Sequence, residues 1–246
     1  MNHRIAAYFT KNKLFRLLTS LLFTALLVSC RSTPPTPPES STKPGVNAEF
    51  LKPDLQVGPW VERFEREGRE IYDQREAIVK ALGLRRGMSV ADIGAGTGLF
   101  TPMFAEAVGE RGTVYAVDIV PEFVKHIEQR AAAARMNHVR AVLCTDRSVE
   151  LPPNSVDLAF ICDTYHHFEF PQSSMKSLHR ALRRGGQVVL IDFKRIPGES
   201  SEWTLNHVRA GQEVFEQEIA SAGFTKMNQV DLLKQNYFVR FRKAGR

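Results

Sequence analysis

The sequence predicts an α/β fold in which helices cover both faces of a mostly parallel β-sheet. Apolar, strand-like runs alternate with helix-like segments along most of the chain, and a glycine-rich turn at residues 94–98 follows the first of these runs. Parallel strands need helical crossovers, and open parallel sheets bind ligands beyond the carboxyl ends of their strands. With 246 residues, 43% of them hydrophobic, we expect one globular domain.

The first thirty residues predict an export signal. Basic side chains precede an uncharged run at residues 17–28, and Ser29 and Cys30 follow. This run is shorter than the roughly 20 apolar residues of a membrane-spanning helix, so we interpret residues 1–29 as a signal peptide. An ordinary signal peptide or an uncleaved anchor is the alternative to lipid attachment.

The ending Leu-Val-Ser-Cys at residues 27–30 resembles the lipobox of bacterial lipoproteins. The resemblance implies that Cys30 becomes the new N-terminus and carries lipid. Acyl chains contribute about 0.8 kcal/mol per buried methylene, so several of them would hold the protein firmly on a membrane. We therefore expect an exported, lipid-anchored protein on the cell membrane or the outer membrane.

The charge of the chain gives no support to nucleic-acid binding. The chain has 33 basic and 27 acidic side chains, but residues 1–30 hold four of the basic ones and none of the acidic ones. The remainder is nearly neutral, so we expect no nucleic-acid partner.

The remaining cysteines, Cys144 and Cys162, end two predicted strands that are not neighbours in the sheet. We expect them to be small buried side chains beyond disulfide reach. No cysteine or histidine spacing resembles a zinc site, so no metal is expected.

A tether and a helical segment precede the sheet. Residues 30–58 begin with a stretch rich in Ser, Thr and Pro and are predicted to be a tether, which leaves residues 59–246 as the folded domain. A helical pattern starts at Trp60 and ends near Gly83. Its aromatic residues Trp60, Phe64 and Tyr72 are candidates for covering a cofactor, although such a stripe is more often part of a core.

The strands and helices of the domain then follow in turn. Strands are predicted at 89–93 and 113–117, with a helix at 100–108 that Gly109 closes between them. Pro121 begins the next helix, to about residue 135, because proline suits a first helical position. The later elements are strands at 139–144, 156–162 and 188–191, a helix at 171–182 stopped by Gly185 and Gly186, a helix at 205–222, and strands at 227–232 and 236–241.

The turn at residues 94–98 is the strongest functional signal. Glycines allow the backbone to turn sharply and to approach a ligand without an intervening side chain. The third glycine is Gly98, and Leu99 occupies the position that a dinucleotide-binding fingerprint would require for glycine. Asp92 places a carboxylate beside the turn, where it would repel a pyrophosphate but suit a cation. The pattern favours a cationic ligand.

Two further acidic residues end strands beside this turn. Asp118 ends the second strand, 20 residues after Gly98, where an acid can accept hydrogen bonds from a ribose. Asp146 follows the third strand, and its alternative is a turn or capping role. Because parallel strands end at one edge, we expect these acids to meet in one crevice.

Together these motifs resemble class I S-adenosylmethionine (SAM)-dependent methyltransferases of the small-molecule type. The resemblance covers about residues 62–224 and rests on five segments in the family's order, residues 90–98, 114–118, 151–158, 163–168 and 182–186. It implies a Rossmann-like, doubly wound seven-stranded sheet of order 3-2-1-4-5-7-6 with the last strand antiparallel. It also implies SAM as the cofactor.

Carried over by position, the resemblance assigns site residues. Along the methionine moiety it places Asp92, Gly94, Gly96 and Gly98, with Asp163 at its end; it places Asp118 and Ile119 at the ribose, and Asp146 and Arg147 near the adenine. The family methylates O, N, C and S atoms, so the resemblance does not choose an acceptor.

His166 and His167 follow the fourth strand, next to where the methyl group would be presented. Either histidine is a candidate catalytic base, and packing or helix capping is the alternative for each. Metal binding is not expected, because adjacent residues project differently and no third ligand is evident. Asp192 and residues 207–209 are further candidates for the mouth of a substrate pocket, or surface residues.

We therefore expect a membrane-tethered SAM-dependent methyltransferase that acts on a small or lipid-like molecule. The alternative is a non-catalytic SAM-binding or interaction module on the cell envelope. A conflict within the sequence prompts this alternative, because SAM is made in the cytoplasm and the N-terminal signal predicts export.

Overall fold

The computed structural model describes residues 38–245. The predicted signal peptide, the predicted lipidation site Cys30 and the first part of the tether lie outside the described residues. None of the helices in the described range is both long and apolar enough to cross a bilayer.

A single seven-stranded sheet forms the centre of the domain, in the order β3-β2-β1-β4-β5-β7-β6. The five strands from β3 to β5 run parallel, whereas β7 is antiparallel to both β5 and β6. This confirms the predicted α/β class and strand order. The strands are β1 (Ser89–Ile93), β2 (Thr113–Asp118), β3 (Val139–Leu143), β4 (Val156–Cys162), β5 (Leu182–Phe193), β6 (Phe224–Val230) and β7 (Asn236–Lys243).

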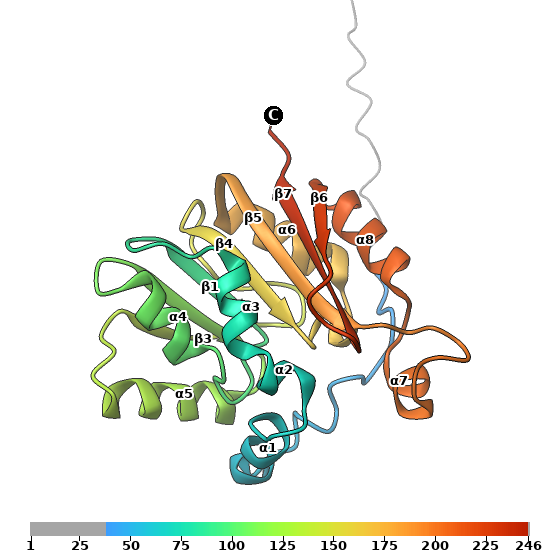
Figure 1. Cartoon of the computed structure of the whole chain (residues 1–246), viewed down its shortest axis with the longest axis horizontal. Coiled ribbons are helices and arrows are strands. Elements are labelled where there is room, and N and C mark those ends of the chain that lie inside the picture. The colour runs from blue at the N-terminus through green and yellow to red at the C-terminus, as the bar shows by residue number, and fades with distance from the viewer. Residues whose placement is uncertain (1–37, 246) are drawn as a thin grey trace, which may run out of the picture. The chain divides into compact units, whose positions relative to one another are not determined.

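Helices cover both faces of this sheet (Figure 1). One apolar core joins the sheet to α2, α3 and α4, and the other joins it to α6 and α8. The helices are α1 (Val57–Phe64), α2 (Glu70–Asp73), α3 (Arg75–Leu82), α4 (Thr101–Val108), α5 (Pro121–Ala133), α6 (Pro171–Ala181), α7 (Glu202–His207) and α8 (Gln212–Ser221), with a 3-10 turn, η1, at Tyr165–His167. Central strands buried on both faces explain why β1 and β4 are almost continuously apolar.

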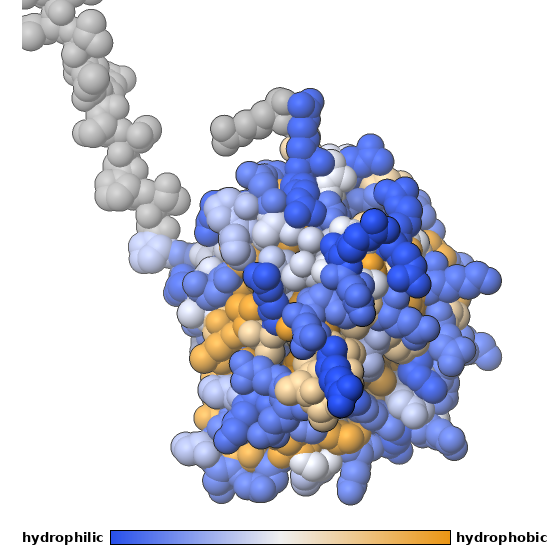
Figure 2. Space-filling view, turned by 90° about the vertical axis from the view of Figure 1, so that its left-hand side faces the viewer, coloured by the Kyte–Doolittle hydropathy of each residue, from blue (hydrophilic) through white to orange (hydrophobic). Residues whose placement is uncertain are grey.

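The outer surface over α4 and α5 is mostly hydrophilic. Figure 2 shows this side of the molecule with blue side chains over most of it and smaller orange areas between them. The large apolar side chains are instead concentrated in the two cores.

The structure divides two helices that the sequence pattern suggests as continuous. The segment before the sheet forms α1, α2 and α3, because the chain breaks at residues 65–69, where Gly68 has φ +81°. The helix predicted at 205–222 is α7 and α8, separated around Gly211, which precedes the first residue of α8. Amphipathic spacing continued across both breaks, so periodicity alone could not locate them.

The predicted stop at Gly185 and Gly186 is wrong. Helix α6 ends at Ala181, and β5 begins directly at Leu182, so both glycines lie inside the strand. The register of β5 against β4 shifts between Val156 and Leu158, and Gly185 has φ +75° at this irregularity. The glycines accommodate a bulge rather than a helix end.

Part of the predicted tether packs onto the domain. Both carboxylate oxygens of Glu39 accept hydrogen bonds from the first turn of α6, at 2.7 Å from the amides of Gln172 and Ser173. An anion at a helix N-terminus satisfies free amides and interacts favourably with the helix dipole. The chain from Glu39 to residue 56, here called the strap, therefore follows the domain surface as part of the compact unit that begins at Glu39.

Candidate functional site

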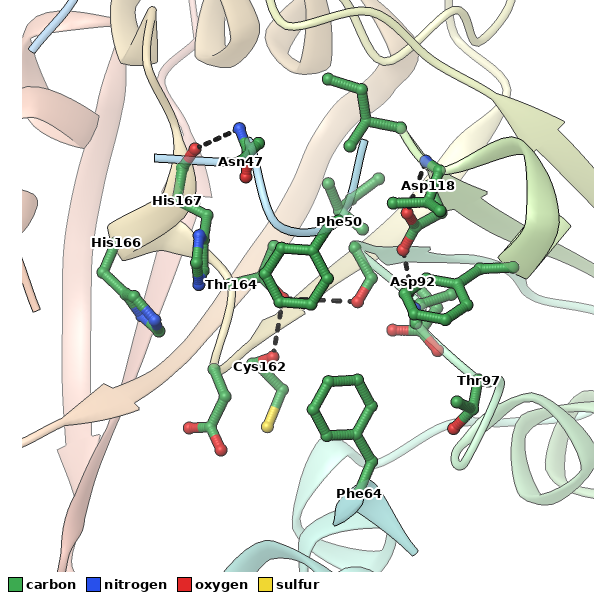
Figure 3. A pocket seen from close by; sticks show the side chains of 18 of the residues that line it. Asn47, Phe50, Phe64, Asp92, Thr97, Asp118, Cys162, Thr164, His166 and His167 are labelled. Carbon is green, nitrogen blue, oxygen red and sulfur yellow. Dashed lines mark hydrogen bonds between the residues drawn. The ribbon is translucent and has the colours of Figure 1, made fainter. Parts of the chain in front are cut away.

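A large cavity lies at the carboxyl ends of the parallel strands. It has a volume of about 430 Å³, within the range of roughly 300–1,000 Å³ that small-molecule sites occupy. Its walls come from the ends of β1, β2 and β4, from η1, α1 and α7, and from the strap. The arrows of β4 and β5 in Figure 1 point towards these carboxyl ends, and Figure 3 shows side chains that line the cavity there.

The glycine-rich turn packs tightly on one side and borders the cavity on the other. A Cβ atom at Gly94 would lie 2.1 Å from the Cγ2 atom of Thr164, and one at Gly98 would lie 2.9 Å from Cγ1 of Ile127. Both glycines have positive φ, which L side chains rarely adopt. They are thus required by the packing of neighbouring elements. Gly96 lines the cavity beneath the ring of Phe64.

A polar network fixes the turn against α1. The Oε1 atom of Glu65 accepts hydrogen bonds from Thr97 Oγ1 at 2.7 Å and from Arg130 Nη1 at 2.8 Å. Arg130 also donates to the Thr97 carbonyl oxygen at 2.9 Å. The break after α1 therefore has a role, because it places Glu65 between the turn and α5.

Asp92 is the most perturbed carboxyl group in the cavity wall. It is 3% exposed, and its Oδ2 atom has no hydrogen-bond partner within the described part of the chain. Burial, with a smaller effect of the neighbouring Asp118, raises the pKa of Asp92 to about 8. A buried, unpartnered carboxyl oxygen is costly unless a ligand satisfies it. A cationic group of a ligand would satisfy this oxygen.

Asp118 is held by the turn that it faces. Its Oδ2 atom accepts a hydrogen bond from the Gly96 amide at 2.7 Å, and its Oδ1 atom accepts one from the Val120 amide at 2.9 Å. Burial raises the pKa of Asp118 to about 6, and these backbone donors oppose the shift. The carboxylate lies beside Asp92 in Figure 3, at the position expected for the ribose.

The remaining cofactor residues predicted from the sequence divide into two groups. Ile119, Asp146 and Asp163 line the cavity. Gly98 and Arg147 lie outside its lining, and the Arg147 guanidinium instead lies 3.4 Å from the ring centre of Phe170.

Asp163 occupies a strained and well-bonded position. It has φ +49°, and its carboxylate binds Arg69 at 2.6 Å and the Asn236 side-chain amide at 2.5 Å. Burial raises the pKa of Asp163, while Arg69 opposes the shift. A non-glycine residue at positive φ costs about 1–3 kcal/mol and persists where surrounding contacts impose it.

The two predicted histidines lie at the other end of the cavity. His166 is 1% exposed, and its Nδ1 atom lies 2.8 Å from Asp192 Oδ1, while its amide donates to Asp192 Oδ2 at 3.1 Å. Asp192 is completely buried, so this carboxylate holds the imidazole with Nδ1 directed towards it and Nε2 directed away. The sequence identified Asp192 as a pocket candidate but not its pairing with His166.

His167 lies beside His166, with their ring centres 4.4 Å apart. Its Nδ1 atom is buried without a hydrogen-bond partner in the described residues. Burial, with a smaller effect of the adjacent His166, lowers the pKa of His167 to about 2. His167 is therefore neutral at physiological pH and a weak base.

His207, at the end of α7, completes a group of three imidazoles. Its ring lies 5.0 Å from that of His166 and 5.1 Å from that of His167, and Trp203 stacks on it at 4.5 Å. One ring nitrogen from each of the three histidines lies within 4.8 Å of the other two. The structure thus removes both reasons that the sequence offered against a metal, since the adjacent rings converge and a third ligand is present.

Aromatic side chains from distant segments close the cavity between its two ends. Phe50 of the strap lies 4.6 Å from Trp60 and 5.3 Å from His167, measured between ring centres. Asn47 fixes the strap by donating to the His167 carbonyl oxygen at 3.1 Å. Trp60 and Phe64 line the cavity as proposed, whereas Tyr72 does not; Arg209, the last of the segment 207–209, pairs with Glu218 at 2.6 Å.

Sequence reasoning missed the contribution of the strap. Phe50 and Asn47 lie in a segment taken for a tether, and the only available signal was the apolar residues that follow the proline-rich stretch. Cys144 and Cys162 line the cavity as free thiols. Burial raises the pKa of Cys144 to about 12 and holds the pKa of Cys162 well above its usual range, so neither thiol ionises readily.

Residues 91–190 match the protein-family description "Methyltransferase domain". The matched range contains the glycine-rich turn, Asp118 and the two adjacent histidines. Together with the sheet order, the match gives this part of the chain the fold of a methyltransferase domain.

Individual proteins are similar over part or most of the chain. A ubiquinone/menaquinone biosynthesis C-methyltransferase of Shewanella sp. (strain ANA-3) is 26% identical over 121 residues, which are 48% of this chain and 47% of that protein. The chain thus aligns with about half the length of this relative. A SAM-dependent methyltransferase from Aquifex aeolicus has the same fold, with a TM-score of 0.68, 24% identity, and coverage of 77% of this chain and 100% of that one. The [4+2]-cyclase SpnF is also similar in fold, with a TM-score of 0.65 and 14% identity over 84% of this chain and 97% of its own.

Proposed function

We propose that this protein transfers the methyl group of SAM to a small or lipid-like acceptor. The observation that carries the proposal is the buried, unpartnered oxygen of Asp92 beside the glycine-rich turn, with Asp118 at hydrogen-bonding distance of that turn. These two carboxylates fit the ammonium and ribose groups of SAM. Ile119 lies in the cavity wall next to Asp118 and fits the ribose, and Asp146 fits the adenine end.

When bound, SAM supplies an electrophilic methyl carbon that an acceptor attacks in line with the carbon–sulfur bond. The acceptor atom forms the new bond to carbon, and the electron pair of the broken bond stays on sulfur. The protein therefore needs mainly to align two molecules, which can contribute several kcal/mol. Asp92 and Asp163 would orient the methionine end from one side of the cavity.

His166 is the better equipped of the two candidate bases. Asp192 accepts the hydrogen bond from its Nδ1 atom, which leaves Nε2 with a lone pair that can take a proton from an acceptor hydroxyl or thiol. His167, with a pKa lowered to about 2, is too weak a base for this role. We therefore assign proton removal to His166 and a positioning role to Asp192.

The acceptor half of the cavity favours a flat, apolar molecule. Phe50, Trp60, Phe123 and Phe193 line it together with the histidines. The similar Shewanella protein is named as a C-methyltransferase of ubiquinone and menaquinone biosynthesis, whose aromatic, lipid-like compounds agree with such a wall. A quinol or a related phenolic lipid is therefore the acceptor class we would test first.

The test is transfer of radiolabelled methyl groups from SAM to extracted envelope lipids and to quinols. We expect a labelled, lipid-soluble product that His166→Gln reduces at least a hundredfold while SAM still binds. Binding of SAM without any labelled product would favour the non-catalytic module instead.

We also propose that Cys30 carries the lipid anchor. The lipobox-like sequence at residues 27–30 supports this proposal, and Cys30 lies outside the described residues. Palmitate labelling of cells that produce the full chain tests it. We expect label in the wild type and none in Cys30→Ser; equal label in both would exclude lipid attachment at this cysteine.

A further inference from the structure

We propose that His166, His167 and His207, here called the histidine cluster, form a zinc site in the acceptor half of the cavity. The inference rests on the proposed function, because it assigns the cluster a role in binding the methyl acceptor. Three imidazole nitrogens and an open fourth position are a ligand set that Zn²⁺ uses in catalytic sites.

The geometry of the cluster is close to that of a metal site. Its three ring nitrogens lie within 4.8 Å of one another. Tetrahedral Zn²⁺ with bonds of about 2.0–2.1 Å needs nitrogens about 3.4 Å apart. Side-chain rotations that shorten the longest separation by about 1.4 Å would therefore complete the site. His207 is well placed for such a movement, because it ends the short helix α7.

Two of the rings each keep a nitrogen that no other protein group in the described part of the chain occupies. Asp192 binds His166 through Nδ1, so the Nε2 atom of His166 remains available as a ligand. A carboxylate behind a metal-binding histidine is a common arrangement that orients the ring. At His167 the Nδ1 atom is buried and has no hydrogen-bond partner within the described residues.

The unpartnered Nδ1 atom of His167 is the second independent observation. A buried polar atom without a partner costs about 1–3 kcal/mol, so it calls for an explanation such as a bound ion.

Charges of both signs surround the cluster. The carboxylates of Asp192 and Asp163 are the nearby acids, and Asp192 contacts His166 directly. Lys43 donates to the His207 carbonyl oxygen at 2.8 Å, and Arg63 also acts on His207. The positive charges of Lys43 and Arg63 disfavour the binding of a metal cation, whereas the negative charge of Asp192 favours it. The effect of Asp192 is the strongest of these, because the residue is completely buried in a region of low dielectric.

Aromatic side chains of the cavity wall pack against each ring of the cluster. Phe50 contacts His167, Phe193 contacts His166, and Trp203 stacks on His207. A metal here would bind an oxygen or sulfur atom of an otherwise apolar acceptor and would make that atom easier to deprotonate. The inference therefore narrows the acceptor to an apolar molecule with a hydroxyl or thiol group.

Metal titration of the purified full-length protein, after removal of metals by a chelator, tests the site. We expect one Co²⁺ per chain with visible absorption bands of a four- or five-coordinate ion, and displacement of Co²⁺ by Zn²⁺. Both His207→Ala and the size-conserving His207→Gln should weaken Zn²⁺ binding at least tenfold. Asp192→Asn should weaken it about ten- to hundredfold, because that carboxylate orients a ligand.

His126→Ala is the matched control, because His126 is a partly buried histidine on α5 outside the cluster. It should leave Zn²⁺ affinity unchanged. The inference is overturned if the wild type binds no stoichiometric Co²⁺, or if both His207 variants bind Zn²⁺ as tightly as the wild type.

A SAM titration of the same samples separates this inference from the proposed function. If the protein binds SAM but no metal, the zinc site is refuted and His166 keeps its role as a free base. If zinc binds, the Nε2 atom of His166 is a ligand, and zinc rather than His166 activates the acceptor. If the protein binds Zn²⁺ but not SAM, the proposed methyltransferase function is refuted and the metal site serves another purpose.

Discussion

The two ends of the cavity are built in different ways. The cofactor end consists of one short segment, residues 92–98, with Asp118 from the neighbouring strand, and backbone hydrogen bonds hold it together. The acceptor end combines the strap, η1, β5 and α7, which lie far apart in the sequence. In this fold a local motif therefore forms the cofactor end, whereas the acceptor end is formed by segments that meet only in the folded chain.

The largest effect should follow from adding a methyl group at the centre of the cofactor end. In Gly94→Ala the new Cβ atom meets Thr164 at 2.1 Å in a backbone conformation with φ +73°. Overpacking and strain together should lower the free energy of unfolding by about 3–5 kcal/mol. Chemical denaturation measures this change.

Gly87→Ala is the matched control for that substitution. Gly87 has φ +85°, but nothing lies within 4 Å of its added Cβ atom. We expect a loss of only about 1 kcal/mol from backbone strain. Equal losses in the two variants would show that Thr164 does not press on the turn.

Removing the charge of Asp92 should separate cofactor binding from stability. Asp92→Asn should weaken SAM binding about ten- to hundredfold, because hydrogen bonds to a charged group contribute about 1.5–3 kcal/mol. The free protein at pH 8 should be at least as stable as the wild type, since burial disfavours the ionised carboxyl group. Calorimetric titration and thermal unfolding measure the two effects.

Asp231→Asn serves as the control for Asp92→Asn, because Asp231 is exposed. It should change neither the SAM affinity nor the stability of the free protein. Unaltered SAM affinity in Asp92→Asn would contradict the role of this carboxylate.

The pH dependence of SAM binding tests the same end of the cavity. The pKa values of Asp92 and Asp118 are raised to about 8 and about 6, from 3.8, so the free folded protein binds more protons than the unfolded chain between these limits. Its stability should fall as the pH rises from about 4 to 8. The cationic cofactor favours the ionised carboxylates, so its binding should release protons and strengthen about tenfold between pH 6 and pH 8.

Calorimetry in buffers of different ionisation enthalpy counts the released protons. Proton uptake on binding, or an affinity that falls over this range, would show that SAM does not face these carboxylates.

The smallest effect concerns the attachment of the strap near the acceptor end. Glu39→Ala removes both hydrogen bonds to the first turn of α6 and should cost about 1 kcal/mol of stability. SAM affinity should stay within twofold. Glu128→Ala, an exposed position on α5, is the control and should have no measurable effect on unfolding. A loss as large in Glu128→Ala would indicate that the strap adds nothing specific.

The sheet and the cofactor end can largely be predicted from the sequence, whereas the acceptor end cannot. The strand at Ser89–Ile93 and the strand at Val156–Cys162 are predicted at their exact bounds, because continuous apolar runs mark strands buried on both faces. Asp92 and Asp118 follow from their places at strand ends. Chain breaks such as the one at Gly68 escape prediction, because they depend on contacts that periodicity does not record.

The acceptor end depends on contacts between residues that are distant in the sequence, and sequence periodicity does not record such contacts. His207 is 40 positions from His167 in the sequence, and only the packing of α7 against η1 brings their rings together. The sequence pattern places Phe50 in a tether, because its contact with Trp60 leaves no periodic pattern in the sequence. Such residues become visible only when the folded chain is examined.

Calorimetric titration of the full-length protein with SAM tests the central claim most directly. We predict binding of one SAM per chain, with an affinity that Asp92→Asn lowers at least tenfold and Asp231→Asn leaves unchanged. The absence of heat and of any thermal shift at millimolar SAM would contradict the claim that this cavity is a SAM site.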